Sequence, residues 1–291
     1  MPSAALVKQL RDATGIGMME CKKALLECDG DFEKARDWLR VKSGSKAEKL
    51  SERAAAEGRI SYAAWGKTGA LLEIVCETDF VARDDNLVAF SDACALALAK
   101  NPSSTDNGDI GQLILADGKN CKESLQELVM KMGENINIRR MRAIRARGQM
   151  RHYIHTGGKI GTMADVEGGN EELGRDICMH IAAMRPLYVA EKDVPAEERE
   201  KEELIFAAQV SDSGKAPEIA PKIIAGKMKK YLQETTLLGQ PFVKEEDATV
   251  GQLLEKRQVQ VHNFALIIAV PDIIQTHGLS LLPSGIIKFK R

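Results

Sequence analysis

A pattern that occurs twice along the chain limits its fold more than any other feature of the sequence. Residues 58–78 have the pattern of two strands with a turn at 66–69, and a segment of helical spacing follows. Residues 148–167 repeat this order around a turn at 156–159. The repeat predicts two related αβ halves rather than one continuous sheet, and hence an α+β fold. The apolar helix positions are Leu87, Phe90, Cys94 and Ala97 in the first copy and Leu173, Ile177, His180 and Ile181 in the second.

The first 40 residues carry the signals of three short helices. Ser3 can cap the first helix, which ends at Thr14-Gly15. The second ends at Asp29-Gly30, and Asp31 can cap the third. A unit of this size is too small to be a catalytic domain and is typical of a docking module. Residues 42–57 carry many charges among small side chains, which predicts a largely exposed helix or linker.

A change of composition near Val194 marks another unit. Pro195 begins a run of Glu and Lys with a narrow apolar seam, and a polar stretch at 211–214 interrupts it. A second amphipathic helix follows, in which Pro221 indicates a late start or a kink. Two such helices joined by a short polar turn predict an antiparallel hairpin that projects from the body. Residues 239–242 then return the chain to the core.

The end of the first half's second strand is unusual because a large aromatic residue follows it. Residues 72–77 alternate apolar and polar side chains with the period of a half-buried strand, which places Phe80 on a corner among charges. From composition alone, a Phe tucked back into the core is favoured, although interfaces also use aromatic anchors. Glu77 and Asp79 could form an acid and base pair. At a strand end both are expected to be solvated, which makes that pair a weak enzyme candidate.

The charge of the chain gives no reason to expect a polyanionic partner, because 41 Lys plus Arg stand against 42 Asp plus Glu in 291 residues. The arginines of the segment Arg139 to Arg145 leave open a ribosome- or RNA-associated binding protein. A strand with one solvated basic face explains them more simply, since no stacking aromatics interleave with them. The sequence shows neither a leader pattern nor an apolar run of membrane-spanning length, so we expect a cytoplasmic protein without membrane contact.

No catalytic motif survives a search of the sequence. The phosphate-loop, dinucleotide-binding, zinc-protease and serine-nucleophile patterns are all absent. His152 and His155 lack a carboxylate or thiol at ligand spacing, so surface histidines are expected there and no metal site. The six cysteines form no C-x-x-C pair and are expected to be reduced and buried. A thiol enzyme built on Cys21 or Cys178 is the weakest hypothesis, because no His and acid accompany either residue. We expect a protein that is not an enzyme.

Short motifs lie in order over residues 3–264. They are Leu10-Arg11 through Thr14-Gly15, residues 17–25, Thr78-Asp79-Phe80-Val81-Ala82, residues 133–140, Lys229-Lys230, residues 239–243 and residues 249–254. Together they closely resemble the bacterial elongation factor Ts family, the nucleotide exchange factors of the GTPase elongation factor Tu. Residues 101–119 stand out as an insertion.

The resemblance implies an architecture. It implies a three-helix domain like the ubiquitin-associated domain, a core of two αβ subdomains and an inserted antiparallel coiled-coil hairpin. On this sequence these become residues 1–54 for the three-helix domain with its linker and residues 55–143 for the first subdomain. Residues 144–190 and 239–291 form the second subdomain and the tail, and residues 191–238 form the hairpin.

The resemblance also implies a mechanism and a partner. Phe80, beside Asp79, would wedge between helices of the GTPase domain of elongation factor Tu and disturb its Mg²⁺ and phosphate-binding loop. The nucleotide and Mg²⁺ belong to that partner, so no cofactor, membrane or nucleic acid is expected here, and a dimer of heterodimers is left open. The implied partner-binding residues are Thr78, Asp79, Phe80, Val81, Met18, Met19, Met132, Gly133 and His155. The turn that carries His155 is longer than the family pattern by Thr156-Gly157-Gly158.

The chain departs from the family at its end. A strand followed by a charged helix is usual there, whereas residues 264–271 are almost wholly apolar. After Pro271 the only acid is Asp272, and Pro283-Ser284-Gly285 interrupts any helix. This predicts a poorly formed C-terminal contact with the partner.

Overall fold

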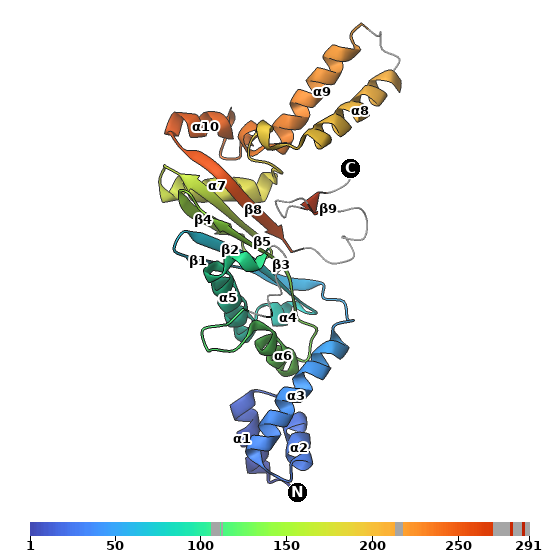
Figure 1. The fold of residues 1–291 in the computed structure, drawn as a ribbon, viewed down its shortest axis with the longest axis vertical. Coiled ribbons are helices and arrows are strands. Elements are labelled where there is room, and N and C mark those ends of the chain that lie inside the picture. Colours follow the sequence, from blue (N-terminus) through green and yellow to red (C-terminus); the bar gives the residue numbers. More distant parts are fainter. Residues whose placement is uncertain (106–110, 112, 213–217, 270–279, 282–286, 289–291) are drawn as a thin grey trace.

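The computed structural model describes residues 1–105, 111, 113–212, 218–269, 280–281 and 287–288. Three N-terminal helices lie at one end of the long axis, two sheets lie in the middle, and a pair of helices lies at the other end (Figure 1). The fold is α+β, as the sequence predicts. Of the polar break predicted at 211–214, residues 211 and 212 still belong to the helix Ala196–Asp212, and residues 213–214 lie outside the described residues, as do the helix breaks at Pro271 and 283–285. Beyond residue 269 only β9 (Ser280–Leu281) and β10 (Ile287–Lys288) are described, as an antiparallel pair.

The N-terminal helices are α1 (Ala4–Thr14), α2 (Met18–Glu27) and α3 (Phe32–Leu50). The predicted caps are present, because Ser3 accepts a hydrogen bond from the Leu6 N–H and Asp31 accepts one from the Lys34 N–H. The helices enclose a small core of their own, which includes the buried residues Leu10, Leu25, Ala35 and Leu39.

Of the largely exposed helix or linker expected over residues 42–57, the helix is confirmed as far as Leu50, but two of its positions are buried. Helix α3 continues without a break to Leu50. Ser43 and Leu50 are buried, because the second half of α3 packs against α6 (Cys121–Met132) and Leu50 joins the core of the first sheet. The sequence does not reveal this narrow contact with α6, because the other faces of α3 are charged.

Two three-stranded antiparallel sheets make up the body. In each, the first two strands form a hairpin, a helix packs on the sheet, and the third strand pairs with the second. The strands are β1 (Glu57–Trp65), β2 (Thr68–Cys76) and β3 (Asn137–Arg145) in one sheet, and β4 (Gln149–Ile154), β5 (Ile160–Glu167) and β8 (Gln260–Ile268) in the other. Helix α5 (Asp85–Lys100) covers the first sheet, and α7 (Glu171–Met184) covers the second.

The free faces of the two sheets pack on each other. Ile60 and Leu71 of the first sheet form one cluster with Met163 and Ile267 of the second. Each central strand has a glycine as its second residue, Gly69 in β2 and Gly161 in β5. A Cβ at Gly161 would lie 2.5 Å from Ile60 Cγ2, and one at Gly69 would lie 2.5 Å from Met150 Cγ. The glycines therefore allow the close approach of the sheets.

Strand β2 is buried along its whole length, which corrects the prediction of a half-buried strand. One face meets α5 and the other meets the second sheet, so even Glu73 has no exposed surface. A bulge in β3 places Arg139 and Arg140 together opposite Glu73, and both guanidinium groups pair with its carboxylate. Their side chains are only 15% and 11% exposed, so the expected solvated basic face is wrong at these two positions.

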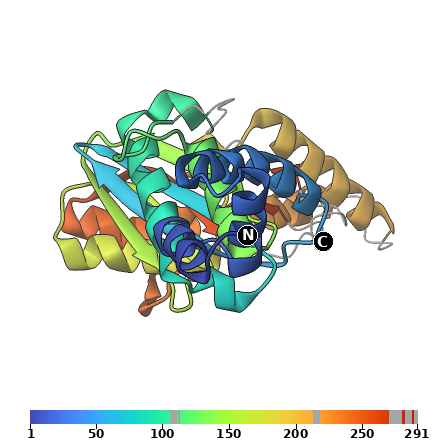
Figure 2. The ribbon, with the colours of Figure 1, turned by 90° about the horizontal axis from the view of Figure 1, so that it is seen from below.

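Helices α8 (Ala196–Asp212) and α9 (Ala220–Thr235) pack on each other and project from the second sheet (Figure 1). Seen from below, the pair extends past the sheets on the right (Figure 2). Pro221 lies in the first turn of α9, so it marks a late start of that helix and not a kink. At the base of the pair, the hydroxyls of Tyr188 and Tyr231 both donate to the carboxylate of Glu198 at 2.6 Å.

The chain returns from the helix pair through a buried polar network around His180. Its Nδ1 accepts the Val243 N–H at 3.2 Å, so its Nε2 carries the proton and donates to Gln240 Oε1 at 3.0 Å. Burial lowers the pKa of His180 and favours this neutral form. The sequence-based expectation of a hydrogen-bonded core histidine is confirmed. The remaining elements of the return are η4 (Leu237–Gly239), β6 (Pro241–Phe242), β7 (Glu245–Thr249) and α10 (Val250–Arg257).

Three short elements complete the described chain. They are α4 (Asp79–Ala82), η1 (Pro102–Thr105) and η3 (Glu191–Asp193). Within the described ranges, no helix is both long and apolar enough to cross a membrane.

Candidate partner-binding site

Phe80 stands out from the corner that follows β2. Its side chain is 83% exposed, so the tucked orientation favoured by composition is wrong. Thr78 caps the single turn of α4 by accepting the Val81 N–H at its hydroxyl, at 3.4 Å. Val81 points the other way and packs against the core of the first sheet. The corner therefore presents one aromatic side chain while its neighbour anchors it.

Asp79 lies beside Phe80 in a surface ion pair. Its carboxylate is 2.9 Å from the Arg83 guanidinium, one turn further along, and both side chains are well exposed. A pair in this setting contributes little to stability. Asp79 is therefore available for a contact outside the chain.

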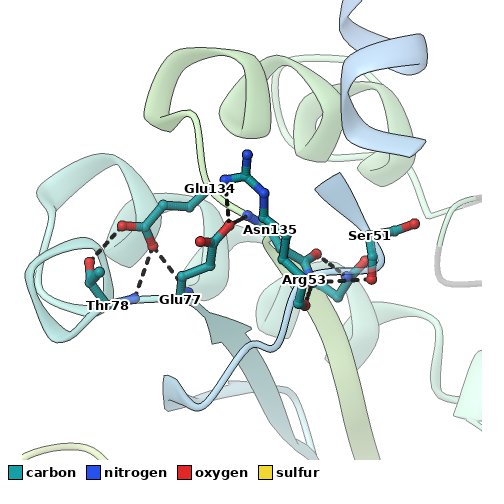
Figure 3. A network of polar contacts seen from close by, with 7 residues as sticks. Ser51, Arg53, Glu77, Thr78, Glu134 and Asn135 are labelled. Carbon is teal, nitrogen blue, oxygen red and sulfur yellow. Dashed lines mark hydrogen bonds and ion pairs between the residues drawn. The ribbon is translucent and has the colours of Figure 1, made fainter. Parts of the chain in front are cut away.

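A polar network joins the corner to the segment that follows α6 (Figure 3). One oxygen of Glu134 accepts the backbone N–H groups of Glu77 and Thr78 at 3.1 and 3.0 Å. The other accepts the Thr78 hydroxyl at 2.6 Å. Glu77 in turn accepts the backbone N–H of Asn135 at 2.7 Å and pairs with Arg53. The expectation that Glu77 is solvated is therefore wrong, because these partners cover most of its side chain.

Asn135 extends the network to the chain that leaves α3. Its side-chain amide donates to the carbonyls of Arg53 and Ser51 at 2.6 and 3.3 Å. Sequence reasoning gave no role to Glu134 or Asn135. The sequence does contain a sign of a distant contact. Two polar residues lie between the helix-ending Gly133 and a strand, and neither the end of the helix nor the start of the strand requires a polar side chain there.

The end of α6 lies next to this network. Gly133 ends the helix with φ 75°, a conformation that favours glycine. Met132 is half-buried against the core of the first sheet, and Met130 packs into the N-terminal helices. Between them, Lys131 donates to Asn86 at the start of α5. One turn of α6 thus joins the N-terminal helices to the corner region.

Met18 and Met19 begin α2, close to the α1–α2 turn that meets Lys131 at Gly15. They are 42% and 76% exposed, so both are accessible, whereas the sequence required only that one of them leave the core.

His155 lies in another part of the body, on the turn between β4 and β5. It is exposed, and its Nδ1 is 2.8 Å from the Tyr153 hydroxyl. The turn contacts the start of β1, where the Ile60 N–H donates to the Gly158 carbonyl and Lys159 pairs with Glu57. The structure therefore brings residues 78–81 close to residues 132 and 133. His155 is not part of this group, because its turn lies against the start of β1.

The structure gives less support to the thiol, metal and RNA sites considered from the sequence. Burial raises the pKa of Cys178 to about 12 and also raises the pKa of Cys21, so neither thiol readily forms the reactive thiolate. His152 stacks on Tyr62 with ring centroids 3.9 Å apart. Among the described residues no group of three or more His, Cys, Asp or Glu could hold a metal ion. The pairing of Arg139 and Arg140 with a buried carboxylate counts against an RNA-binding strand.

Comparison with known proteins shows the family to which this sequence belongs. The family model described as "Elongation factor TS" matches residues 77–269. The chain belongs to the elongation factor Ts family. Elongation factor Ts of Nitrosomonas eutropha is 47% identical over 266 residues, which are 91% of this chain and 90% of that protein. Elongation factor Ts of Nitrosospira multiformis is 46% identical over 281 residues, or 95% and 92% of the two chains. Membership of the elongation factor Ts family makes this chain an elongation factor of translation.

Proposed function

We propose that this chain is a guanine-nucleotide exchange factor that acts on the GTPase elongation factor Tu. Family membership supports the partner and the activity. The observation that carries the proposal is the exposure of Phe80 on a corner whose backbone is fixed by Glu134 and by the Thr78 cap. A large apolar side chain in that setting costs little entropy to insert into a partner.

The proposed mechanism is a wedge. Phe80 enters between helices of the partner's GTPase domain, with Asp79 as its polar guide, and the displaced helices disturb the Mg²⁺ and phosphate-binding loop of that domain. Nucleotide and factor then compete, because the factor binds the nucleotide-free state more tightly than the loaded state. The chain needs no bond-breaking chemistry and no cofactor of its own for this, since nucleotide and Mg²⁺ belong to the partner.

Other contacts extend the proposed interface. Met18 and Met19 offer flexible apolar side chains to the GTPase domain, and Met132 with Gly133 forms the surface next to the wedge. Thr78 and Val81 complete the corner. His155 is proposed to touch a more distant domain of the partner, which is consistent with its exposure on a separate turn.

The remaining features of the proposal concern architecture and location. We assign residues 1–54 to a three-helix domain like the ubiquitin-associated domain, residues 55–143 and 144–190 with 239–291 to the two subdomains, and residues 191–238 to a coiled-coil hairpin. The exposed Leu204 on this hairpin suits a second copy of the complex, and hence a dimer of heterodimers. The protein acts in the cytoplasm without direct nucleic-acid contact.

Release of fluorescently labelled GDP from elongation factor Tu tests the proposal. Catalytic amounts of the chain should accelerate release, and Phe80→Ala should slow the accelerated rate by about thirtyfold, the effect of losing a central interface residue. Trp65→Ala is the matched control, because Trp65 is another exposed aromatic residue and lies at the end of β1, away from the corner. Equal rates for the wild type and a folded Phe80→Ala variant would reject the wedge.

A further inference from the structure

The carboxylate of Glu134 accepts three hydrogen bonds from the two residues that lead into the corner. Helix α4 has only four residues, too few to be stable on its own hydrogen bonds. Its orientation must therefore come from contacts to the rest of the body. Glu134 supplies three of them, all within two residues of Asp79.

The Thr78 hydroxyl explains why a carboxylate suits this position. A hydroxyl has one proton, and here it goes to Glu134 at 2.6 Å. The lone pairs of the hydroxyl then face the Val81 N–H, which it caps. Glu134 thus orients the cap as well as holding the backbone, and hydrogen bonds to a charged acceptor are the stronger kind.

Residues 77–78 and residues 134–135 hold each other by hydrogen bonds in both directions. The Glu77 N–H donates to Glu134, and the Asn135 N–H donates to Glu77. Each segment therefore offers one carboxylate to the other's backbone, and a shift of either segment breaks bonds on both sides (Figure 3). Asn135 ties the same pair to the carbonyls of Ser51 and Arg53.

We propose that Glu134 is a positioning residue for nucleotide exchange, which sets the direction of Phe80 through Thr78 and the backbone of residues 77–78. It acts through the wedge and makes no contact with the nucleotide. The proposal rests on the exchange function proposed above, and the experiment separates the two.

The test is a double-mutant cycle measured by labelled GDP release. Glu134→Ala should slow release by about tenfold in the otherwise native chain, since it removes three hydrogen bonds to a charged group. In the Phe80→Ala background the same change should have almost no further effect, because the side chain that Glu134 directs is gone. An additional tenfold loss in that background would overturn the proposal, as it would show an independent role for Glu134.

Two further variants keep the cycle decisive. Glu134→Gln retains an oxygen for the two N–H groups but turns the Thr78 hydroxyl around, so its release rate should lie between those of the wild type and Glu134→Ala. Thr78→Val removes the hydroxyl at constant shape and should also slow release. Urea midpoints within about 0.3 M of the wild type would exclude general unfolding as the cause.

The outcomes distinguish the two levels of the proposal. If Phe80→Ala leaves release unchanged, the proposed wedge fails. If Phe80→Ala slows release but a folded Glu134→Ala does not, the positioning role alone fails.

Discussion

Replacing Glu73 by Gln should destabilise the fold more than any exchange of a surface carboxylate. Glu73 has no exposed surface and neutralises Arg139 and Arg140, which are themselves mostly buried. Gln fills nearly the same volume but carries no charge, so both guanidinium groups lose the carboxylate that they share. Breaking a buried ion pair from one side costs about 3 to 5 kcal/mol.

The loss is a large fraction of the stability of an ordinary protein, which is about 5 to 15 kcal/mol. Urea unfolding followed by circular dichroism would measure it. With a slope of about 3 kcal/mol per molar urea for a chain of this length, the midpoint should fall by about 1 M or more. Arg140 also donates to the Ile268 carbonyl of β8, so the loss should extend to the packing of the two sheets.

Glu33→Gln is the matched control. Glu33 pairs with Arg36 at 2.6 Å, but both side chains are more than half exposed, so the expected cost is below about 1 kcal/mol. Midpoints that fall by the same small amount in both variants would refute the reasoning, because they would show that the arginines obtain equivalent partners or water without Glu73.

Two other predictions concern stability. Burial lowers the pKa of His180 in the folded chain, so the unfolded chain binds more protons once the pH falls below the ordinary pKa of 6.5. The free energy of unfolding should therefore fall as the pH drops through that value. His180→Gln should make the urea midpoint less dependent on pH. A dependence that is equally steep in the variant would remove His180 as the cause. Gly161→Ala should cost about 1 to 3 kcal/mol, since its Cβ would meet Ile60 at 2.5 Å, whereas Gly226→Ala in α9 has open space and should be neutral or stabilising. Calorimetry can rank the pair, and equal melting temperatures would contradict the close approach of the sheets.

Features set by neighbours in the chain could be predicted from the sequence. The caps at Ser3 and Asp31 and the irregularity at Pro221 are local, because each depends on a few adjacent backbone groups; the sequence left a late start or a kink open at Pro221, and α9 shows the late start. The repeated strand order was also visible, since both copies carry the same turn and helix signals. These features were sufficient to predict the α+β class.

Features set by distant contacts could not be predicted in this way. Glu73 alternates with apolar neighbours as a solvent-facing residue would, and only the second sheet and the β3 bulge make it a buried counter-ion. Helix α3 reads as charged beyond residue 42, yet its contact with α6 buries Ser43 and Leu50.

The candidate site was only partly accessible to sequence reasoning. Phe80 was identified through its motif, whereas composition alone favoured a buried side chain. Its exposure depends on where α4 leaves the sheet. Glu134 was missed because it acts on a segment more than 50 residues away: its position after Gly133 shows that it has a partner elsewhere but does not show which segment that is.

Helix α6 belongs to two hydrophobic cores at once. Met130 lies in the core of the N-terminal helices, while its neighbours Leu128 and Val129 lie in that of the first sheet. Helix α6 thus connects the domain that carries Met18 and Met19 to the subdomain that carries Phe80. For a partner that engages both, the first contact places the second at a high effective concentration, with little orientational entropy left to lose. A substitution at Met130 that disrupts the packing of α6 on the N-terminal helices should therefore weaken binding through both contacts together far more than binding through either contact alone.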